Sequence, residues 1–145
     1  MSKVEDFLSK TEEKEIVDAI ISAELNTSGE IRVHIERKTK ISHYNRSVEL
    51  FHKLKMNETA AKNGVLIYVA VEDKKFVIYG DTAIDAVVAD DFWDAIKDSM
   101  QKQFKQGNFK QGIIEGILKT GEALKLHFPW QENDKDELPN EISKN

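Results

Sequence analysis

Carboxylate side chains in this sequence gather where they could bind a hard divalent cation. Asp81, Asp85, Asp90 and Asp91 follow one another within a short stretch, and Glu30 opens an alternating pattern much earlier in the chain. Calcium takes about six to eight oxygen ligands, which carboxylate and amide side chains supply. We therefore expect a metal site built from these carboxylates, with calcium or another divalent cation as the ligand.

Two further residues stand where they could line the same site. Asn63 precedes a long apolar run, and Trp93 stands at the start of an expected helix. An ordinary structural interpretation stays open beside the metal one: Asp90 is a plausible helix N-cap and Trp93 suits the core. Asp81 and Asp85 would then be turn residues. The spacing of the acids matches no EF-hand loop, so spacing alone does not identify a metal site.

Glu72 and Asp73 form a second-choice site, in the charged turn that follows the apolar run. Asp73 could ligate a metal or act as a base, and Lys74 or Lys75 could contact a phosphate. Open α/β sheets commonly bind ligands at the carboxyl ends of their strands, where this turn should lie. Asp is also common in hairpin turns, so a purely structural turn is the alternative.

Motifs for nucleophilic catalysis are absent from the sequence. It contains no cysteine, no Gly-x-Ser-x-Gly elbow and no phosphate-binding Gly-x-x-x-x-Gly-Lys-Ser/Thr loop. The four histidines show no His-x-x-x-His metal spacing, and we expect them at the surface or at the rim of a site. The catalytic residues of any enzymatic activity are therefore unknown at this point.

Composition narrows the class of protein. A chain of 145 residues with 32% charged residues and a net charge of −5 is typical of a single globular domain. The negative balance argues against a nucleic-acid partner, because phosphate binding needs clustered Lys and Arg. The first residues lack the apolar core of a signal peptide, and no apolar run approaches the ~20 residues that span a bilayer. We expect a soluble, cytoplasmic protein without membrane insertion.

The segments that must position the candidate ligands follow a β-α-β-β order. Residues 30–36 alternate between apolar and polar, which is typical of a strand with one buried face. Residues 65–71 form a continuous apolar run, which predicts a strand covered on both faces, and residues 76–79 form another β-rich run. The short turn between these two runs predicts an antiparallel hairpin, whereas the helix expected between residues 36 and 65 makes the first two strands parallel.

This topology decides where the candidate ligands meet. Glu30 begins the first strand, Asn63 precedes the second, and Asp81 follows the end of the antiparallel third, so all three should lie at one edge of the sheet. The predicted fold class is α/β: a three-layer α/β/α sandwich with a small central mixed sheet, to which a further edge strand could add.

The chain divides into one domain and a tail. Residues 1–130 carry the periodic patterns and should form a single domain. Residues 131–145 hold five acids, two lysines and almost no apolar residue, which predicts a disordered acidic tail. Within the domain, Gly112, Gly116 and Gly121 recur along the last expected helix. Glycines at this spacing predict that a neighbouring segment packs closely against that helix.

Several of these pieces resemble the TPM domain family, which is named after thylakoid lumenal, photosystem-associated and nematode modulator proteins. The matching pieces are Thr27-Ser28-Gly29-Glu30-Ile31-Arg32-Val33, Asn63-Gly64-Val65-Leu66-Ile67-Tyr68-Val69-Ala70, Gly80-Asp81, Phe92-Trp93 and Leu126-His127-Phe128-Pro129. The resemblance covers about residues 11–129 and implies an α/β/α sandwich. It implies an acidic crevice for a divalent cation in some relatives and acid phosphatase activity in others. Many relatives carry a signal peptide and a membrane anchor, so this chain resembles the short, standalone soluble form.

Three functions follow as hypotheses. The first is a regulatory or binding module whose acidic crevice takes a divalent cation. The second is a metal-assisted phosphomonoesterase, in which the cation would polarise a phosphoryl oxygen and activate water. The third is an adaptor that binds a protein partner and no small ligand. The first two share one cation site, so they differ in chemistry and not in the residues expected to hold the metal.

Overall fold

The computed structural model describes residues 7–130 and 142–144. Its elements, in chain order, are α2 (Lys10–Glu24), β1 (Glu30–Glu36), α3 (His43–Lys53), the 3-10 helix η1 (Met56–Glu58), β2 (Gly64–Ala70), β3 (Lys75–Gly80), α4 (Thr82–Val87), α5 (Phe92–Lys105), α6 (Phe109–His127) and β4 (Ser143–Lys144).

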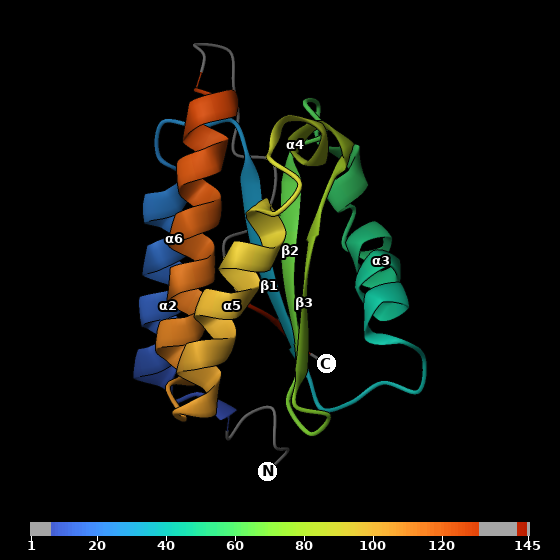
Figure 1. The fold of residues 1–145 in the computed structure, drawn as a ribbon, viewed down its shortest axis with the longest axis vertical. Helices are drawn as coiled ribbons and strands as arrows, with labels where there is room; N and C mark the ends of the chain where they lie inside the picture. Colours follow the sequence, from blue (N-terminus) through green and yellow to red (C-terminus); the bar gives the residue numbers. More distant parts are fainter. Residues whose placement is uncertain (1–6, 131–141, 145) are drawn as a thin grey trace.

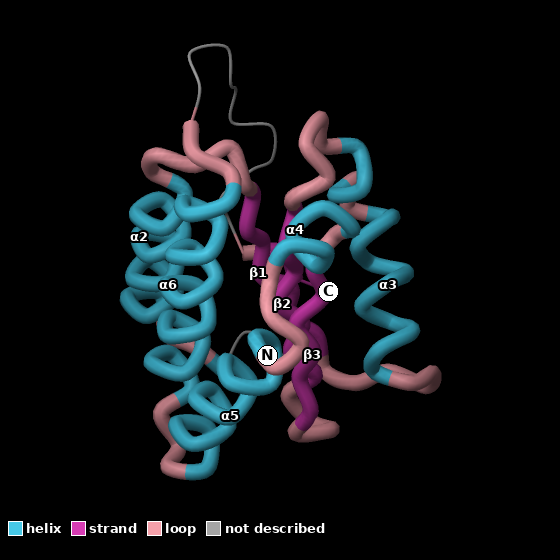
Figure 2. The backbone as a smooth tube through the Cα atoms, turned by 45° about the horizontal axis from the view of Figure 1, so that its top comes forward, coloured by secondary structure: helices cyan, strands magenta, loops and turns pink. Residues whose placement is uncertain are grey.

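The elements form three layers around one mixed sheet. The strand order in the sheet is β3-β2-β1-β4. Helices α2, α5 and α6 cover one face of this sheet and α3 covers the other, as both backbone views show (Figures 1 and 2). The predicted α/β/α sandwich is therefore confirmed.

Strand pairing follows the predicted topology. β1 and β2 are parallel, with Glu30 opposite Gly64, and α3 lies in the crossover between them. β2 and β3 are antiparallel, with Val65 opposite Gly80. The starts of β1 and β2 therefore lie beside the end of β3.

A fourth strand comes from the carboxyl-terminal segment. Ser143–Lys144 forms β4, which pairs in parallel with β1 at His34 and Ile35. A disordered tail was expected over residues 131–145, so this short strand was not foreseen there. Residues 131–141 and 145 lie outside the described part of the chain.

The core has two parts, separated by β2. Every residue of β2 is buried, as expected for a central strand. Apolar side chains from β1, β2, α2, α5 and α6 form the larger cluster, and Leu50, Phe51, Met56, Leu66 and Tyr68 form the core of the smaller one under α3. Burying a side chain of this size contributes about 1.5–3 kcal/mol, so the two clusters hold all three layers together.

The glycines of α6 allow close packing, as their spacing predicted. A Cβ atom built on Gly121 would lie 2.7 Å from the Cβ of Ala23 in α2, and one built on Gly116 would lie 2.6 Å from the sulfur of Met100 in α5. At Gly112 the ring of Phe104 lies 2.5 Å from such an atom. Two neighbouring helices therefore pack directly against the backbone of α6.

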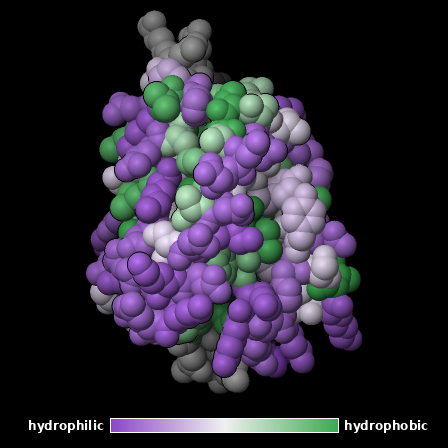
Figure 3. Space-filling model, in the orientation of Figure 1, coloured by the Kyte–Doolittle hydropathy of each residue, from purple (hydrophilic) through white to green (hydrophobic). Residues whose placement is uncertain are grey.

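The face of the molecule that Figure 3 shows is mainly polar. Hydrophilic residues cover most of the face seen in Figure 3, and hydrophobic residues show between them over its middle. No helix within residues 7–130 and 142–144 has the length and apolar character needed to cross a membrane.

Candidate functional site

Three strand ends meet at one rim of the sheet, which we call the Glu30 rim and define by Glu30, Asn63 and Asp81. The N–H of Asp81 donates to the carbonyl oxygen of Gly64 over 2.9 Å, and the N–H of Glu30 donates to that of Asn63 over 3.5 Å. These bonds place the first residues of β1 and β2 beside the residue that follows β3. The topology thus brings together three of the residues named from the sequence.

The side chains of the Glu30 rim are buried. Asn63 is fully buried, Glu30 is 2% exposed and Asp81 is 8% exposed. The amide of Asn63 donates to the Ser28 hydroxyl over 3.1 Å, and Oδ1 of Asp81 accepts from the N–H of Thr82 over 2.7 Å. Asp81 is thereby the N-cap of α4. The side chains of Asn63 and Asp81 thus each use one polar atom in a hydrogen bond to a neighbouring part of the structure.

Their second oxygen atoms have no such bond. Oδ1 of Asn63 and Oδ2 of Asp81 are buried and accept no hydrogen bond within the part of the chain that the structure describes. A buried acceptor left without a donor costs about 1–3 kcal/mol. Such atoms in proteins commonly contact an ordered water or an ion. The Glu30 rim therefore contains two buried acceptor atoms that the described residues leave without a hydrogen-bond donor.

Asp85 and Trp93 lie next to the rim and contact each other. The indole N–H of Trp93 donates to Oδ1 of Asp85 over 3.0 Å. The Trp93 ring also lies over Gly80, where a Cβ atom would come within 2.6 Å of it. Trp93 is half-buried and belongs to the edge of the larger core cluster. It therefore joins the start of α5 to the end of β3.

Asp90 and Asp91 are exposed residues in the turn between α4 and α5. Asp90 was a plausible N-cap of the following helix, but Asp91 holds that position and its side chain makes no capping bond. Among residues 7–130 and 142–144, no three His, Cys, Asp or Glu side chains come together in a way that could hold a metal ion. The described structure therefore does not assemble the wider set of five acids.

The second-choice acids bind neighbouring loop residues. Glu72 forms an ion pair with Arg37. Oδ2 of Asp73 accepts from the N–H of Thr39 over 3.1 Å and lies 2.9 Å from Nε2 of His43. The bond with His43, followed by that from Thr39, lowers the pKa of Asp73. Both acids thus fasten the loop after β1 to the β2–β3 hairpin.

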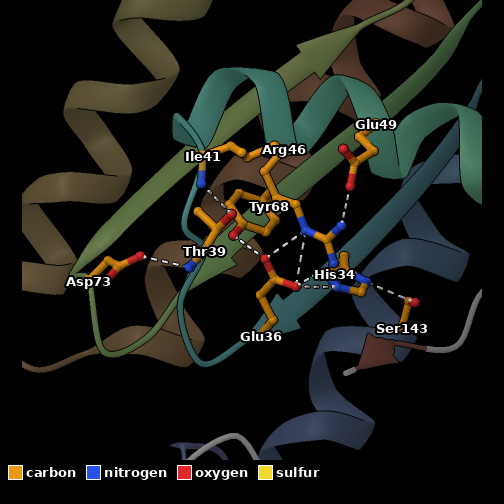
Figure 4. A network of polar contacts seen from close by, with 9 residues as sticks. All are labelled: His34, Glu36, Thr39, Ile41, Arg46, Glu49, Tyr68, Asp73 and Ser143. Carbon is orange, nitrogen blue, oxygen red and sulfur yellow. Dashed lines mark hydrogen bonds and ion pairs between the residues drawn. The ribbon is translucent and has the colours of Figure 1, made fainter.

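A buried polar network that was not predicted lies on the α3 face of the sheet (Figure 4). Glu36, 4% exposed, is held by two nitrogens of Arg46, with Nη2–Oε1 at 2.8 Å and Nε–Oε2 at 3.0 Å. The hydroxyl of the fully buried Tyr68 donates to the same carboxylate. Hydrogen bonds to Glu36 raise the pKa of Arg46, whereas burial, followed by the bond to Glu36, raises that of Tyr68.

His34 is part of this network, although the histidines were expected at the surface or at a rim. It is 1% exposed, and its Nδ1 lies 3.0 Å from the Ser143 hydroxyl of β4. Burial lowers the pKa of His34 to about 4, against a smaller opposing effect of Glu36, so the ring is neutral at pH 7. In a neutral ring, Nδ1 can accept a hydrogen bond from the Ser143 hydroxyl, and this bond joins β4 to the network.

One sequence signal could have revealed this network. Tyr68 stands in a continuous apolar run, and a tyrosine in a fully buried strand needs a partner for its hydroxyl. Glu36 and His34 lie on the polar face of the neighbouring strand, which is where that partner would be found.

Comparisons with known proteins agree with the fold. A family model described as the TPM domain matches residues 1–123. The NMR structure of BA42 protein from the psychrophilic bacterium Bizionia argentinensis is 61% identical, with a TM-score of 0.91 and complete coverage of both chains. No curated protein matches the chain.

Two more distant structures share the fold alone. The N-terminal domain of a protein from P. gingivalis is 17% identical, with a TM-score of 0.70 over 87% of this chain and 83% of that one. The N-terminal domain of cg2496 protein from Corynebacterium glutamicum is 14% identical, with a TM-score of 0.64 over 81% of this chain and 74% of that one.

Proposed function

Because the chain belongs to the TPM domain family, we propose that it is a binding module that takes a divalent cation at the Glu30 rim. Calcium is the first candidate, since it accepts an irregular shell of oxygen ligands. Glu30 and Asp81 would supply carboxylate oxygens and Asn63 would supply an amide oxygen. Water and backbone carbonyls would complete the shell.

The observation that carries this proposal is the pair of buried oxygen atoms that accept no hydrogen bond from the described residues 7–130 and 142–144. Oδ1 of Asn63 and Oδ2 of Asp81 come from segments that the backbone bond between Asp81 and Gly64 holds side by side. Both atoms are acceptors that remain after each side chain has made its structural bond. A cation would satisfy both at once and would also offset the buried charge of Asp81.

Binding at this rim would act on the fold in a defined way. The proposed ligands come from the start of β1, the start of β2 and the N-cap of α4, so a shared cation would cross-link three segments. An ion that binds only the folded state raises stability by about 2.7 kcal/mol when its concentration is a hundred times its dissociation constant. The resulting regulation would be an ordering of the rim when calcium is present.

Thermal unfolding in calcium and in chelator tests the proposal. The wild-type chain should unfold at a higher temperature in calcium, and Asp81→Asn should lose most of that shift. Asn keeps an oxygen that can cap α4, so the variant removes charge without removing the cap. Asp98→Asn, in an exposed position of α5, is the matched control and should keep the wild-type shift. Equal melting temperatures with and without calcium would reject the proposal.

The same proteins separate a binding module from a phosphomonoesterase. Hydrolysis would use the cation to polarise a phosphoryl oxygen and to activate water. Turnover of an aryl phosphate by wild-type protein, lost in Asp81→Asn but kept in Asp98→Asn, would assign that activity to the rim. Calcium binding without turnover would leave the binding module as the function.

A further inference from the structure

An apolar cavity lies at the opposite end of the sheet from the Glu30 rim. Its volume is about 700 Å³, and it is lined by the β2–β3 hairpin, the end of α5, the start of α6 and Phe7, and opens to the solvent on one side. Figure 1 shows this hairpin at the bottom of the view, level with the lower end of α5. The apolar wall includes Phe7, Val69, Val71, Phe76, Phe104 and Phe109.

The four phenylalanines form a continuous aromatic surface. Ring centroids lie 5.0 Å apart for Phe76 and Phe104, 5.7 Å for Phe104 and Phe109, and 4.8 Å for Phe109 and Phe7. Phe109 is 36% exposed, so part of this surface faces the solvent. Aromatic rings arranged in this way offer an apolar ligand a large contact area.

The mouth of the cavity is positively charged. Lys74, Lys75 and Lys105 line it, are exposed, and form no ion pair within residues 7–130 and 142–144. The acid in the lining is Glu72, which is already paired with Arg37. The lining therefore contributes three exposed ammonium groups against one carboxylate, which is paired with Arg37.

We propose that this cavity binds a small amphipathic carboxylate, with an alkyl tail against the phenylalanines and the carboxylate among the three lysines. Cavities that hold small ligands typically measure about 300–1,000 Å³ and combine apolar walls with a few polar groups, which describes this one. The tail fits the aromatic surface, and the anionic head complements the charge of the mouth. A cationic amphiphile would instead be repelled by the three ammonium groups.

The site is independent of the cation module. The Glu30 rim lies where β1 and β2 begin, whereas the cavity is lined by Val69 and Phe76, where β2 ends and β3 begins. No side chain is shared between the two sites. Loss of calcium binding would therefore leave the cavity unchanged.

Titration of the full-length, ¹⁵N-labelled chain with octanoate tests the proposal. Amide signals of Val71, Phe76 and Phe104 should shift and saturate, whereas 1-octanol should bind at least about fivefold more weakly because it lacks the charge. Lys74→Gln and Lys105→Gln should each weaken octanoate by up to about fivefold, since exposed charge pairs contribute this much at most. Lys102→Gln, on α5 but outside the lining, should bind as wild type.

Several outcomes would overturn the proposal. The first is the absence of shifts with octanoate up to about 10 mM, a concentration well above a millimolar dissociation constant. Three other results would show that the lysines do not bind the carboxylate. They are equal affinity for 1-octanol, tighter binding of octylammonium, and unchanged octanoate affinity in both lysine variants. Cavity shifts that depend on protein concentration without ligand would identify a second copy of the chain as the occupant.

Discussion

The backbone N–H of Asp81 donates to the carbonyl oxygen of Gly64 over 2.9 Å. This bond holds the residue after β3 against the residue that follows Asn63. As a result, two side chains that each have one oxygen without a donor among residues 7–130 and 142–144 lie at one end of the sheet. One oxygen of the Asp81 carboxylate caps α4, and the other accepts no hydrogen bond from these residues.

If the second oxygen of Asp81 serves a ligand, removing its charge should not weaken the ligand-free protein. In chelator, Asp81→Asn should have a free energy of unfolding equal to or above that of wild type, because it removes a buried charge and keeps the cap. Urea unfolding measures this. A fall of more than about 1 kcal/mol would assign the carboxylate a structural task instead.

The bond between Tyr68 and Glu36 should contribute to stability. Tyr68→Phe leaves a buried carboxylate oxygen without its hydroxyl donor and should cost about 1–3 kcal/mol. Glu36→Gln removes the negative charge and one of the two acceptor oxygens that pair with the half-buried Arg46, and should cost about 3–5 kcal/mol.

Urea unfolding with Glu49→Gln as the control checks both values. Glu49 contacts the same arginine from an exposed position, so its replacement should cost less than about 1 kcal/mol. Equal losses in Glu36→Gln and Glu49→Gln would contradict the assigned importance of burial.

The fold itself was predictable to the extent that periodicity reports burial. The alternation of apolar and polar residues in 30–36 predicts a strand with one buried face, and the continuous apolar run at 65–71 predicts a strand buried on both faces. The short turn that follows residue 71 predicts the antiparallel hairpin. β4 could not be predicted, because Ser143–Lys144 is a polar pair with no periodicity of its own. Its position depends on the edge of β1 being available for pairing.

The candidate site was predictable only in part. Strand order brings Glu30, Asn63 and Asp81 to one rim, since their positions at strand ends are fixed by the topology. The orientation of Asp90 and Asp91 depends on a turn whose conformation is set by α4 and α5, and no spacing rule predicts it. The burial of His34 depends on what covers the polar face of β1, which lies far away in sequence.

Stability should fall as the pH is lowered from about 7 to 4, because His34 stays neutral in the folded chain. Its folded pKa of about 4 lies below the ordinary value of 6.5, so the unfolded chain binds the extra proton throughout this window. The decrease in the free energy of unfolding that is due to His34 is at most about 3 kcal/mol over this pH range, because a shift of one pKa unit corresponds to 1.36 kcal/mol.

Unfolding curves of His34→Gln against wild type isolate this effect. The slope with pH should be shallower in the variant, whatever its absolute stability. The exposed His127→Gln serves as the control and should keep the wild-type slope. Parallel curves for His34→Gln and wild type would show that His34 titrates alike in the folded and unfolded chains.

Close packing of α6 on α2 should make Gly121 intolerant of a methyl group. Gly121→Ala gains up to about 1 kcal/mol of helix propensity. However, its Cβ would meet the Cβ of Ala23 at 2.7 Å and the backbone of Ala23 at 3.1 Å. Overpacking typically costs about 1–3 kcal/mol, so a net loss of stability is expected.

Lys119→Ala, at an exposed position of α6, is the control and should change stability by less than about 0.5 kcal/mol. A Gly121→Ala protein more stable than wild type would mean that the helices separate without cost.

A calcium titration of the ¹⁵N-labelled full-length chain, followed by amide shifts, tests the proposed cation site most directly. Saturable shifts are expected at Glu30, Asn63, Gly64 and Asp81, with much weaker binding in Asp81→Asn. Shifts confined to Glu72 and Asp73 at the opposite end of the sheet, or no saturable shift at all, would contradict a cation site at the Glu30 rim.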